Sequence, residues 1–206
     1  MATSNTAEAT PKTTRKGRRP ARERIFEAAK ELFYLNGIRA VGVEGIAAEA
    51  GTTKMSLYRS FQSKDELVAE CLRDHQNEFW AWWDDAVAPH EGDPKAQLFA
   101  LIDAFQMASC ASTSHGCPLA NAIVEINDDE HPGRQVITEH KNEFRRRLRA
   151  LSHEMGAQDP DQLGDALMLL IEGSYVCQLI FDRSDCPIDS LYWSVRTLVD
   201  AHIDGD

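Results

Sequence analysis

Helical periodicity is the feature of this sequence that most constrains its fold. From Pro20 onward, apolar residues recur three and four positions apart, as they do along one buried face of an α-helix. The alternation of a strand persists nowhere beyond a few residues, and the sequence has no hairpin-turn signal. We therefore predict an all-α fold with about nine helices and no internal repeat.

Capping residues, glycines and prolines set the limits of these helices. Asn36-Gly37 ends the first pattern, and Ser63-Lys-Asp-Glu66 is a capping box that opens a long helix. Asp93-Pro94 and Asp159-Pro160 place an N-cap residue before a proline in the first helical turn. The expected helices cover residues 20–36, 43–50, 54–61, 64–87, 94–112, 118–126, 132–155, 160–181 and 187–203.

The charge is divided unevenly along the chain. Residues 1–64 hold 12 lysines and arginines against 6 acidic residues, whereas the remainder of the chain has a net charge of −17. A basic head on an acidic body suits the binding of a polyanion such as DNA through the head. We predict a flexible basic arm over residues 1–19, a helix-turn-helix DNA-binding domain over 20–66, and an effector-binding and dimerisation domain over 67–206.

The two short helices within residues 43–61 are typical of a helix-turn-helix. Small residues at positions 47, 50 and 51 let the helices cross closely, which frees the outer face of the second for a major groove. On that face Arg59 suits a two-pronged contact with guanine, and the hydroxyls of Thr53 and Tyr58 suit phosphate oxygens. The candidate DNA-binding residues are Thr52, Thr53, Lys54, Met55, Ser56, Tyr58, Arg59 and Lys64, with Arg18 and Arg19 from the arm.

The N-terminal region resembles the DNA-binding domain of TetR-family repressors. The likeness lies in RIFEAAKELFYLNG (residues 24–37) and IAAEAGTTKMSLYRSFQSKDEL (residues 46–67), where apolar, glycine, tyrosine and lysine positions fall in register. The resemblance implies a homodimer on a pseudo-palindromic double-stranded operator, released when a small effector binds the C-terminal domain. It also places Thr53, Tyr58 and Lys64 at phosphate-contact positions, and residues 54–56 and 59 on the recognition helix.

The sequence departs from that family just before the first short helix. Family members usually carry Thr or Ser there, where this chain has Val41-Gly42. Glycine can occupy an N-cap but brings no hydroxyl to a phosphate. We expect the basic residues 15–19 to compensate from the minor groove, the alternative being that the arm is only a solubilising tail.

The last two helices are expected to pair with their copies in a four-helix bundle, as the resemblance implies. The apolar helix at 160–181 could instead be only the central core helix of the domain. Aromatic and sulfur-containing residues of the C-terminal domain suggest an apolar or flat effector. The candidate pocket residues are Trp83, Phe99, Ile102, Phe105, Cys110, Leu119, Ile123, Phe144, Met168, Ile171 and Tyr175.

A second functional hypothesis concerns the segment Ser114-His-Gly-Cys117-Pro118. A thiol at a helix N-terminus near His115 favours the thiolate, so Cys117 with Cys110 could form a redox switch on a DNA-binding protein. The spacing of Cys110, His115 and Cys117 lacks the paired pattern of a structural zinc site. We therefore expect no metal and no cofactor.

The remaining signals exclude several classes of protein. The longest apolar runs, such as residues 166–171, are too short to span a bilayer, and the N-terminus has no apolar core of a secretory signal. Reduced cysteines in a cytoplasm are therefore the expected state. No catalytic motif occurs, which argues against the rival hypothesis of an all-α enzyme or small-molecule carrier. Neither the effector nor the choice between repression and activation follows from the sequence.

Overall fold

The computed structural model describes residues 19–109, 115–182 and 184–203. Within these ranges it contains nine α-helices, two short 3-10 helices (η1 and η2) and no strand, which confirms the predicted all-α fold. The elements are α1 (Ala21–Asn36), α2 (Val43–Glu49), α3 (Lys54–Ser60), α4 (Lys64–Val87), η1 (Ala88–His90), α5 (Pro94–Ser109), α6 (Pro118–Glu125), α7 (Pro132–Glu154), α8 (Pro160–Ile180), η2 (Pro187–Asp189) and α9 (Ser190–Ile203).

The caps form much as the sequence predicts, with two differences. The side chain of Ser63 accepts a hydrogen bond from the Glu66 amide at 3.0 Å, but the Glu66 carboxylate accepts from the amide of Gln62 rather than Ser63. The last predicted helix is also divided, because residues 187–189 form η2 and α9 begins only at Ser190. The side-chain amide of Gln106 donates to the Ile188 carbonyl at 2.8 Å, so a bond from outside the helix occupies that carbonyl.

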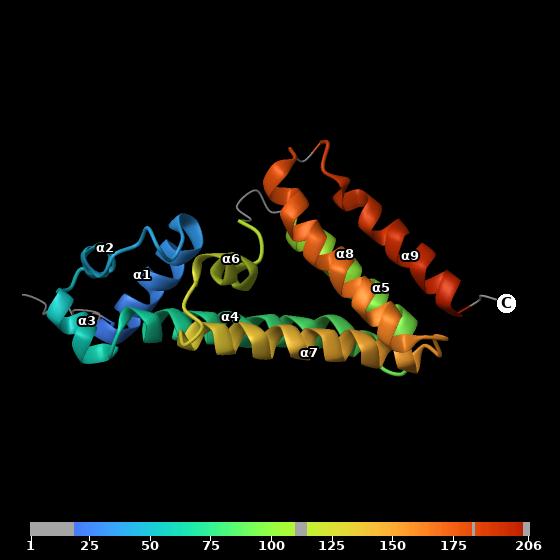
Figure 1. The fold of residues 1–206 in the computed structure, drawn as a ribbon, viewed down its shortest axis with the longest axis horizontal. Coiled ribbons are helices and arrows are strands. Elements are labelled where there is room, and N and C mark those ends of the chain that lie inside the picture. The colour runs from blue at the N-terminus through green and yellow to red at the C-terminus, as the bar shows by residue number, and fades with distance from the viewer. Residues whose placement is uncertain (1–18, 110–114, 183, 204–206) are drawn as a thin grey trace, which may run out of the picture.

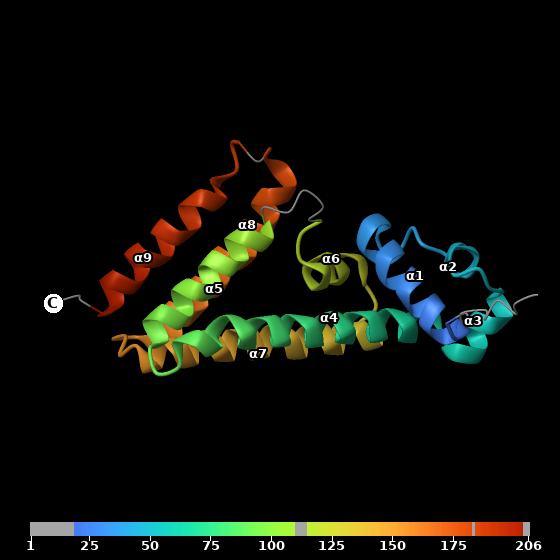
Figure 2. The same ribbon diagram turned by 180° about the vertical axis from the view of Figure 1, so that it is seen from behind.

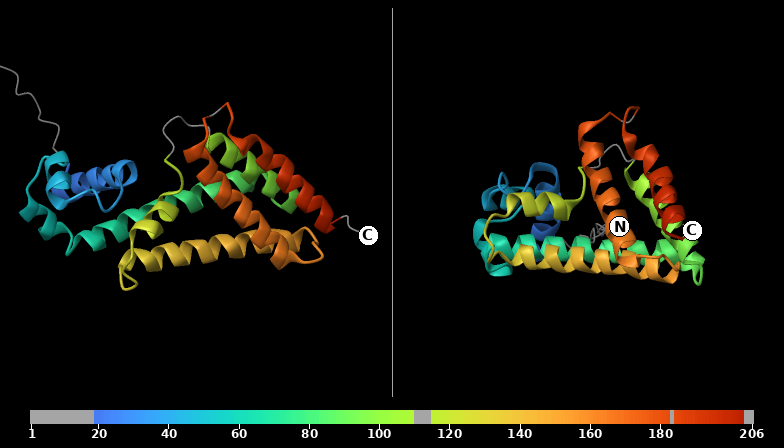
Figure 3. Two further views of the ribbon diagram at one scale, coloured as in Figure 1. Left: turned by 45° about the horizontal axis from the view of Figure 1, so that its top comes forward. Right: turned by 45° about the vertical axis from the view of Figure 1, so that its right-hand side comes forward.

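Helices α4 and α7 form the long axis of the molecule (Figure 1). They run side by side in the same direction, since His131 lies 3.4 Å from Asp65 at one end and Arg147 pairs with Asp84 at 2.5 Å near the other. The unit α1–α3 lies at one end of this axis, and α5, α8 and α9 form an inclined group at the other, as Figure 2 shows from behind. Helix α6 lies between the two groups (Figure 3).

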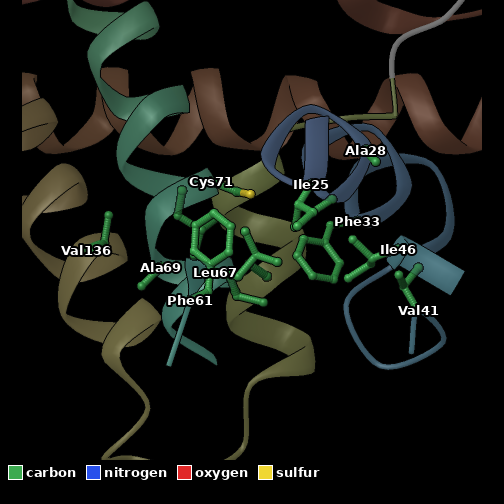
Figure 4. Close-up of a cluster of buried hydrophobic side chains, with 14 of the residues drawn as sticks. Ile25, Ala28, Phe33, Val41, Ile46, Phe61, Leu67, Ala69, Cys71 and Val136 are labelled. Carbon is green, nitrogen blue, oxygen red and sulfur yellow. The ribbon is translucent and has the colours of Figure 1, made fainter. Parts of the chain in front are cut away.

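One hydrophobic cluster joins the N-terminal helices to the rest of the chain (Figure 4). Ile25, Ile46, Leu57 and Leu67, from α1 to α4, are fully buried in it. The same cluster continues into α6 and the start of α7. The predicted boundary after residue 66 therefore falls inside α4 and within a shared core, so a displacement of α6 or α7 reaches the packing of α1–α4.

A second cluster fills the other end, where α8 packs against α7 in the opposite direction. Asp165 of α8 accepts from Arg145 and Arg149 of α7, whose guanidinium groups hold the pKa of that carboxyl well below its usual range. A Cβ added at Gly164 would lie 2.7 Å from the backbone nitrogen of Arg149. Only glycine permits so close an approach of the two helices.

Candidate DNA-binding face and ligand cavity

An arginine from α1 fixes the turn between α2 and α3. The guanidinium of Arg24 donates to the carbonyl of Ala50 at the end of α2 and to that of Gly51, the latter at 3.1 Å. Gly51 has a φ of +58°, which favours glycine at this point of the turn. A cation at the C-terminal carbonyls of a helix also complements its dipole. The turn of the helix-turn-helix thus depends on α1 as well as on its own residues.

Helix α3 presents its predicted recognition residues to solvent. Thr53 is the N-cap and its hydroxyl accepts from the amide of Ser56 at 3.2 Å. Met55 and Tyr58 are 66% and 44% exposed, and Arg59 is exposed with no ion pair to any residue that the structure describes. These side chains point away from Leu57, which is fully buried. The exposed set has the chemistry for phosphate and base contacts.

Two predicted DNA-contacting lysines are engaged within the fold. Lys54 pairs with Glu44 of α2 at 2.6 Å, but both side chains are exposed, so this pair costs little to break. Lys64 is half-buried and donates to the Ile38 carbonyl at 2.6 Å, so it holds the segment after α1 against the start of α4. Among the other predicted residues, Thr52 is half-buried, Arg19 is exposed, and Arg18 lies outside the described residues.

The first turn of α2 lacks a side-chain cap. Gly42 occupies the N-cap in an extended conformation, and no side chain accepts a hydrogen bond there. Its neighbour Val41 is buried in the N-terminal core. Because glycine stands where the family usually has Thr or Ser, the first amides of α2 have no N-cap hydroxyl beside them.

A cavity of about 860 Å³ lies where the N-terminal unit meets the rest of the chain. Residues from α1, α4, α5, α6, α7 and α8 line it. The volume lies within the range of sites for small organic molecules. Three of the predicted pocket residues stand in its wall: Phe105, Phe144 and Tyr175.

Most of the other predicted pocket residues pack elsewhere. Their apolar character is that of core packing, and they contribute to one of the two hydrophobic clusters rather than to the cavity. This set comprises Trp83, Phe99, Ile102, Leu119, Ile123, Met168 and Ile171. Cys110 lies outside the described residues.

Polar groups are gathered on one side of the cavity, around the start of α6. Lys141 of α7 donates to Glu172 of α8 at 2.5 Å and lies 3.7 Å from the thiol of Cys117. The hydroxyl of Tyr34 accepts from the amide of His115 at 2.8 Å. Burial raises the pKa of Tyr175, so its phenol stays protonated.

His140 is a buried histidine in the same wall. It is 2% exposed, and its Nδ1 has no hydrogen-bond partner among the residues that the structure describes. Burial, together with the nearby Lys141 and His75, lowers the pKa of His140 to about 3, so the imidazole is neutral. A buried polar atom without a partner costs free energy unless something enters to satisfy it.

Protonation of His140 is expected to make the stability of the chain pH-dependent. Its pKa is about 3 in the folded chain against a reference value of 6.5, so between these values the unfolded chain binds more protons. The free energy of unfolding therefore falls with falling pH, by up to about 1.4 kcal/mol per pH unit from this group. Urea unfolding at several pH values should show a shallower slope in His140→Leu. His153→Leu, exposed on the same helix, should keep the wild-type slope.

Helix α6 is hydrogen-bonded to the turn that follows α1. The amide of Arg39 donates to the Glu125 carboxylate at 2.8 Å, and its guanidinium donates to the Glu125 carbonyl at the same distance. Glu125 also approaches Gly37 so closely that a Cβ built there would lie 2.9 Å from the carboxylate. Gly37 has a φ of +84°. The cavity wall and the DNA-binding unit are thus joined by hydrogen bonds.

The cysteine hypothesis concerns the same wall. Cys117 is the N-cap residue of α6, as its sequence position predicts, and its side chain is buried. Its proposed partner, Cys110, lies outside the described residues. Among the residues described, no group of three histidine, cysteine or acidic side chains is placed to hold a metal ion.

The sequence prediction missed the contribution of α1 and of three polar residues to the cavity. Tyr34 comes from the N-terminal unit, and His75, His140 and Lys141 belong to α4 and α7. A signal for His140 was present, since it occupies a position of the apolar stripe that runs through Ile137 and Phe144. A histidine at such a position marks a buried polar group.

A helix-turn-helix at one end of an all-helical chain is the arrangement of a DNA-binding regulator of transcription. The family described as "Bacterial regulatory proteins, tetR family" matches residues 25–71. A structure of a putative TetR-type transcriptional regulator (sav143) from Streptomyces avermitilis is 30% identical, with a TM-score of 0.79 over 89% of this chain and 98% of that one. The chain belongs to the TetR family.

Two further relatives agree with this assignment. SCO4454, a TetR-family transcriptional regulator from Streptomyces coelicolor, is 26% identical with a TM-score of 0.82 over 88% of this chain and 95% of that one. The transcriptional repressor KstR2 of Rhodococcus jostii is 35% identical over 98 residues, which are 48% of each protein. The chain therefore spans about half the length of the curated relatives in that match. These relatives are regulators rather than enzymes, and they do not favour the redox hypothesis.

Proposed function

We propose that this chain is a dimeric, cytoplasmic repressor that leaves a palindromic DNA operator when a small apolar or aromatic effector enters the cavity. The observation that carries the proposal is the connection of α6 to α1. Arg39 and Glu125 hold the cavity wall to the DNA-binding unit through two hydrogen bonds of 2.8 Å. An effector that favours another position of α6 therefore favours another position of α1–α3.

The geometry of DNA supplies the rest of the mechanism. Two recognition helices must lie about one helical turn of DNA apart, roughly 34–36 Å, to reach both half-sites. A ligand that binds better to a conformation with another spacing shifts the population away from the DNA-bound state. We infer repression as the outcome of operator binding because the curated relatives named KstR2 are repressors.

An unpartnered apolar face on α8 and α9 supports the dimer. Leu169, Val176 and Ile180 follow one face of α8 and are 75%, 54% and 67% exposed. Trp193 of α9 is 68% exposed. Contiguous exposed apolar side chains of this kind mark a protein interface, and a second copy of α8 and α9 is the occupant we infer.

Helix α8 is also long and apolar enough to cross a membrane, and only 28% of its most apolar 18-residue stretch is buried. Its charged residues argue for a protein interface instead. Asp165 pairs with Arg145 and Arg149, and Glu172 pairs with Lys141, all toward α7. These ion pairs hold one side of α8 against α7. Its other side is the exposed apolar face, and a second protomer would cover it.

Selection of bound duplexes from a random library, at about 0.1 M salt, tests DNA binding directly. Enrichment of a palindrome is expected, and affinity should fall steeply as salt rises because phosphate contacts release counterions. The enriched duplex then serves as the probe for release by candidate effectors. A folded, dimeric protein that enriches no sequence, before and after refolding to remove bound ligand, would favour the carrier or enzyme hypothesis.

Arg59 is expected to read bases rather than phosphates alone. Arg59→Ala should weaken binding to the enriched duplex by about 5- to 150-fold, the range for loss of a two-pronged base contact, and should weaken binding to unrelated DNA much less. Fluorescence anisotropy with both duplexes measures the two affinities. Arg146→Ala is the matched control, because that arginine is exposed on α7 and, among the residues described, pairs only with Glu143 on its own helix. An equal loss on both duplexes removes Arg59 from base recognition.

A further inference from the structure

The charged groups of the cavity wall are already paired. Lys30 donates to Asp74 at 2.5 Å and to Glu78 at 2.6 Å, and Lys141 donates to Glu172 at 2.5 Å. No other lysine or arginine lines the cavity among the described residues. The glutamates of the wall, Glu27, Glu31, Glu125 and Glu172, outnumber its two lysines among the described residues. The wall therefore repels an anionic ligand and offers it no unpaired cation.

The interior surface around His140 is largely aromatic, with the Lys141–Glu172 ion pair at its edge. The ring of His140 lies edge-on to Phe79, with the centroids 4.8 Å apart. Phe79 also contacts Phe105 and Phe144, at 6.2 and 5.8 Å between centroids, and Phe105 meets Tyr175 at right angles. Flat rings pack well against such a wall.

His140 is the polar side chain of this aromatic surface that needs a hydrogen-bond partner. Its Nδ1 is buried without a partner in the described part of the chain, although the residue stands in the wall of a cavity large enough for an organic molecule. A neutral imidazole has one donor and one acceptor nitrogen, and a ligand hydroxyl both donates and accepts. A hydroxyl therefore satisfies the imidazole in either tautomer, which a purely apolar ligand does not.

We propose that the cavity binds an uncharged, flat aromatic compound carrying a hydroxyl group that hydrogen-bonds to His140. The proposal rests on the cavity being the effector site and specifies the chemical class of the effector. The aromatic wall selects the ring system, His140 selects the hydroxyl, and the carboxylates exclude acids.

Four pyrene derivatives with one ring system test the proposal on the wild-type chain without DNA. They are 1-hydroxypyrene, 1-methylpyrene, pyrene-1-carboxylate and 1-pyrenemethylammonium, each followed by its own fluorescence. The hydroxyl compound is expected to bind about tenfold more tightly than the methyl compound, as one buried hydrogen bond provides. Pyrene-1-carboxylate should bind more weakly than either, because the acidic wall repels an anion. 1-Pyrenemethylammonium has no acceptor for the imidazole N–H, so it should bind more weakly than 1-hydroxypyrene. Equal binding of the hydroxyl and methyl compounds, or tightest binding of a charged one, overturns the proposal.

Substitutions then test whether His140 causes the preference for the hydroxyl compound. In His140→Leu the hydroxyl preference should fall to about one while 1-methylpyrene still binds, which shows that the cavity persists. His153→Leu on the same helix should keep the preference. The ranking of the four compounds decides the proposal even if the leucine variant does not fold. Release of the operator is measured separately from ligand binding. If 1-hydroxypyrene binds without releasing DNA, the proposed function alone is contradicted. If pyrene-1-carboxylate releases DNA, only the proposed ligand class is contradicted.

Discussion

Replacing Gly164 with alanine is expected to lower the free energy of unfolding by about 3 kcal/mol, at the upper end of overpacking effects. The added methyl group would lie 2.6–2.7 Å from the Cγ, Cα and backbone nitrogen of Arg149. Helix α8 must then move away from α7, which also loosens the ion pairs of Asp165. Urea unfolding at fixed protein concentration measures the change, because the stability of a dimer depends on that concentration.

Gly45→Ala is the matched control for Gly164→Ala. Gly45 is exposed inside α2, and a Cβ built there meets nothing within 4 Å. Alanine has the higher helix propensity, so this variant should gain up to about 1 kcal/mol. A Gly164→Ala protein as stable as the wild type would show that α7 and α8 separate without loss of packing.

Glutamate at position 169 is expected to convert the proposed dimer into monomers. Leu169 is 75% exposed on the protomer, and a two-fold interface would bury two copies of the new charge. Light scattering after size-exclusion chromatography reports the mass. Affinity for a palindromic duplex should fall by about 100-fold or more, since each half-site then binds alone.

Val124→Glu provides the comparison for Leu169→Glu. Val124 is 76% exposed on α6, a helix outside the proposed interface, so its substitution should leave the dimer intact. A Leu169→Glu protein that remains dimeric would place the interface elsewhere.

The helices were predictable because their signals are local. Periodicity and caps placed the start of α4 at Lys64 and of α8 at Pro160, where the structure has them. The recognition helix was predictable for the same reason, since residues 53–59 lie within two turns of one helix. Helix ends were less certain, as the separate η2 shows, because Gln106 contacts Ile188 from 82 residues away.

The cavity was only partly predictable because it depends on contacts between distant segments. Periodicity identifies the inward face of a helix, but not whether that face meets another side chain or an empty volume. Phe144 and Ile171 both face inward, yet Phe144 lines the cavity and Ile171 packs in the core. Tyr34 was assigned to the DNA-binding unit by sequence, and only the fold brings it to His115.

The sharing of α1 between the DNA-binding unit and the cavity wall has a thermodynamic consequence for gene control. Coupling between two binding sites is reciprocal, so a ligand that weakens operator binding by some factor is itself bound more weakly, by the same factor, when the protein is on DNA. Under the function proposed above, the operator thus acts as an antagonist of the ligand through the contacts of Glu125 with Arg39. A regulator of this design responds at a higher ligand concentration on a strong operator than on a weak one, so the DNA sequence sets the threshold for each gene.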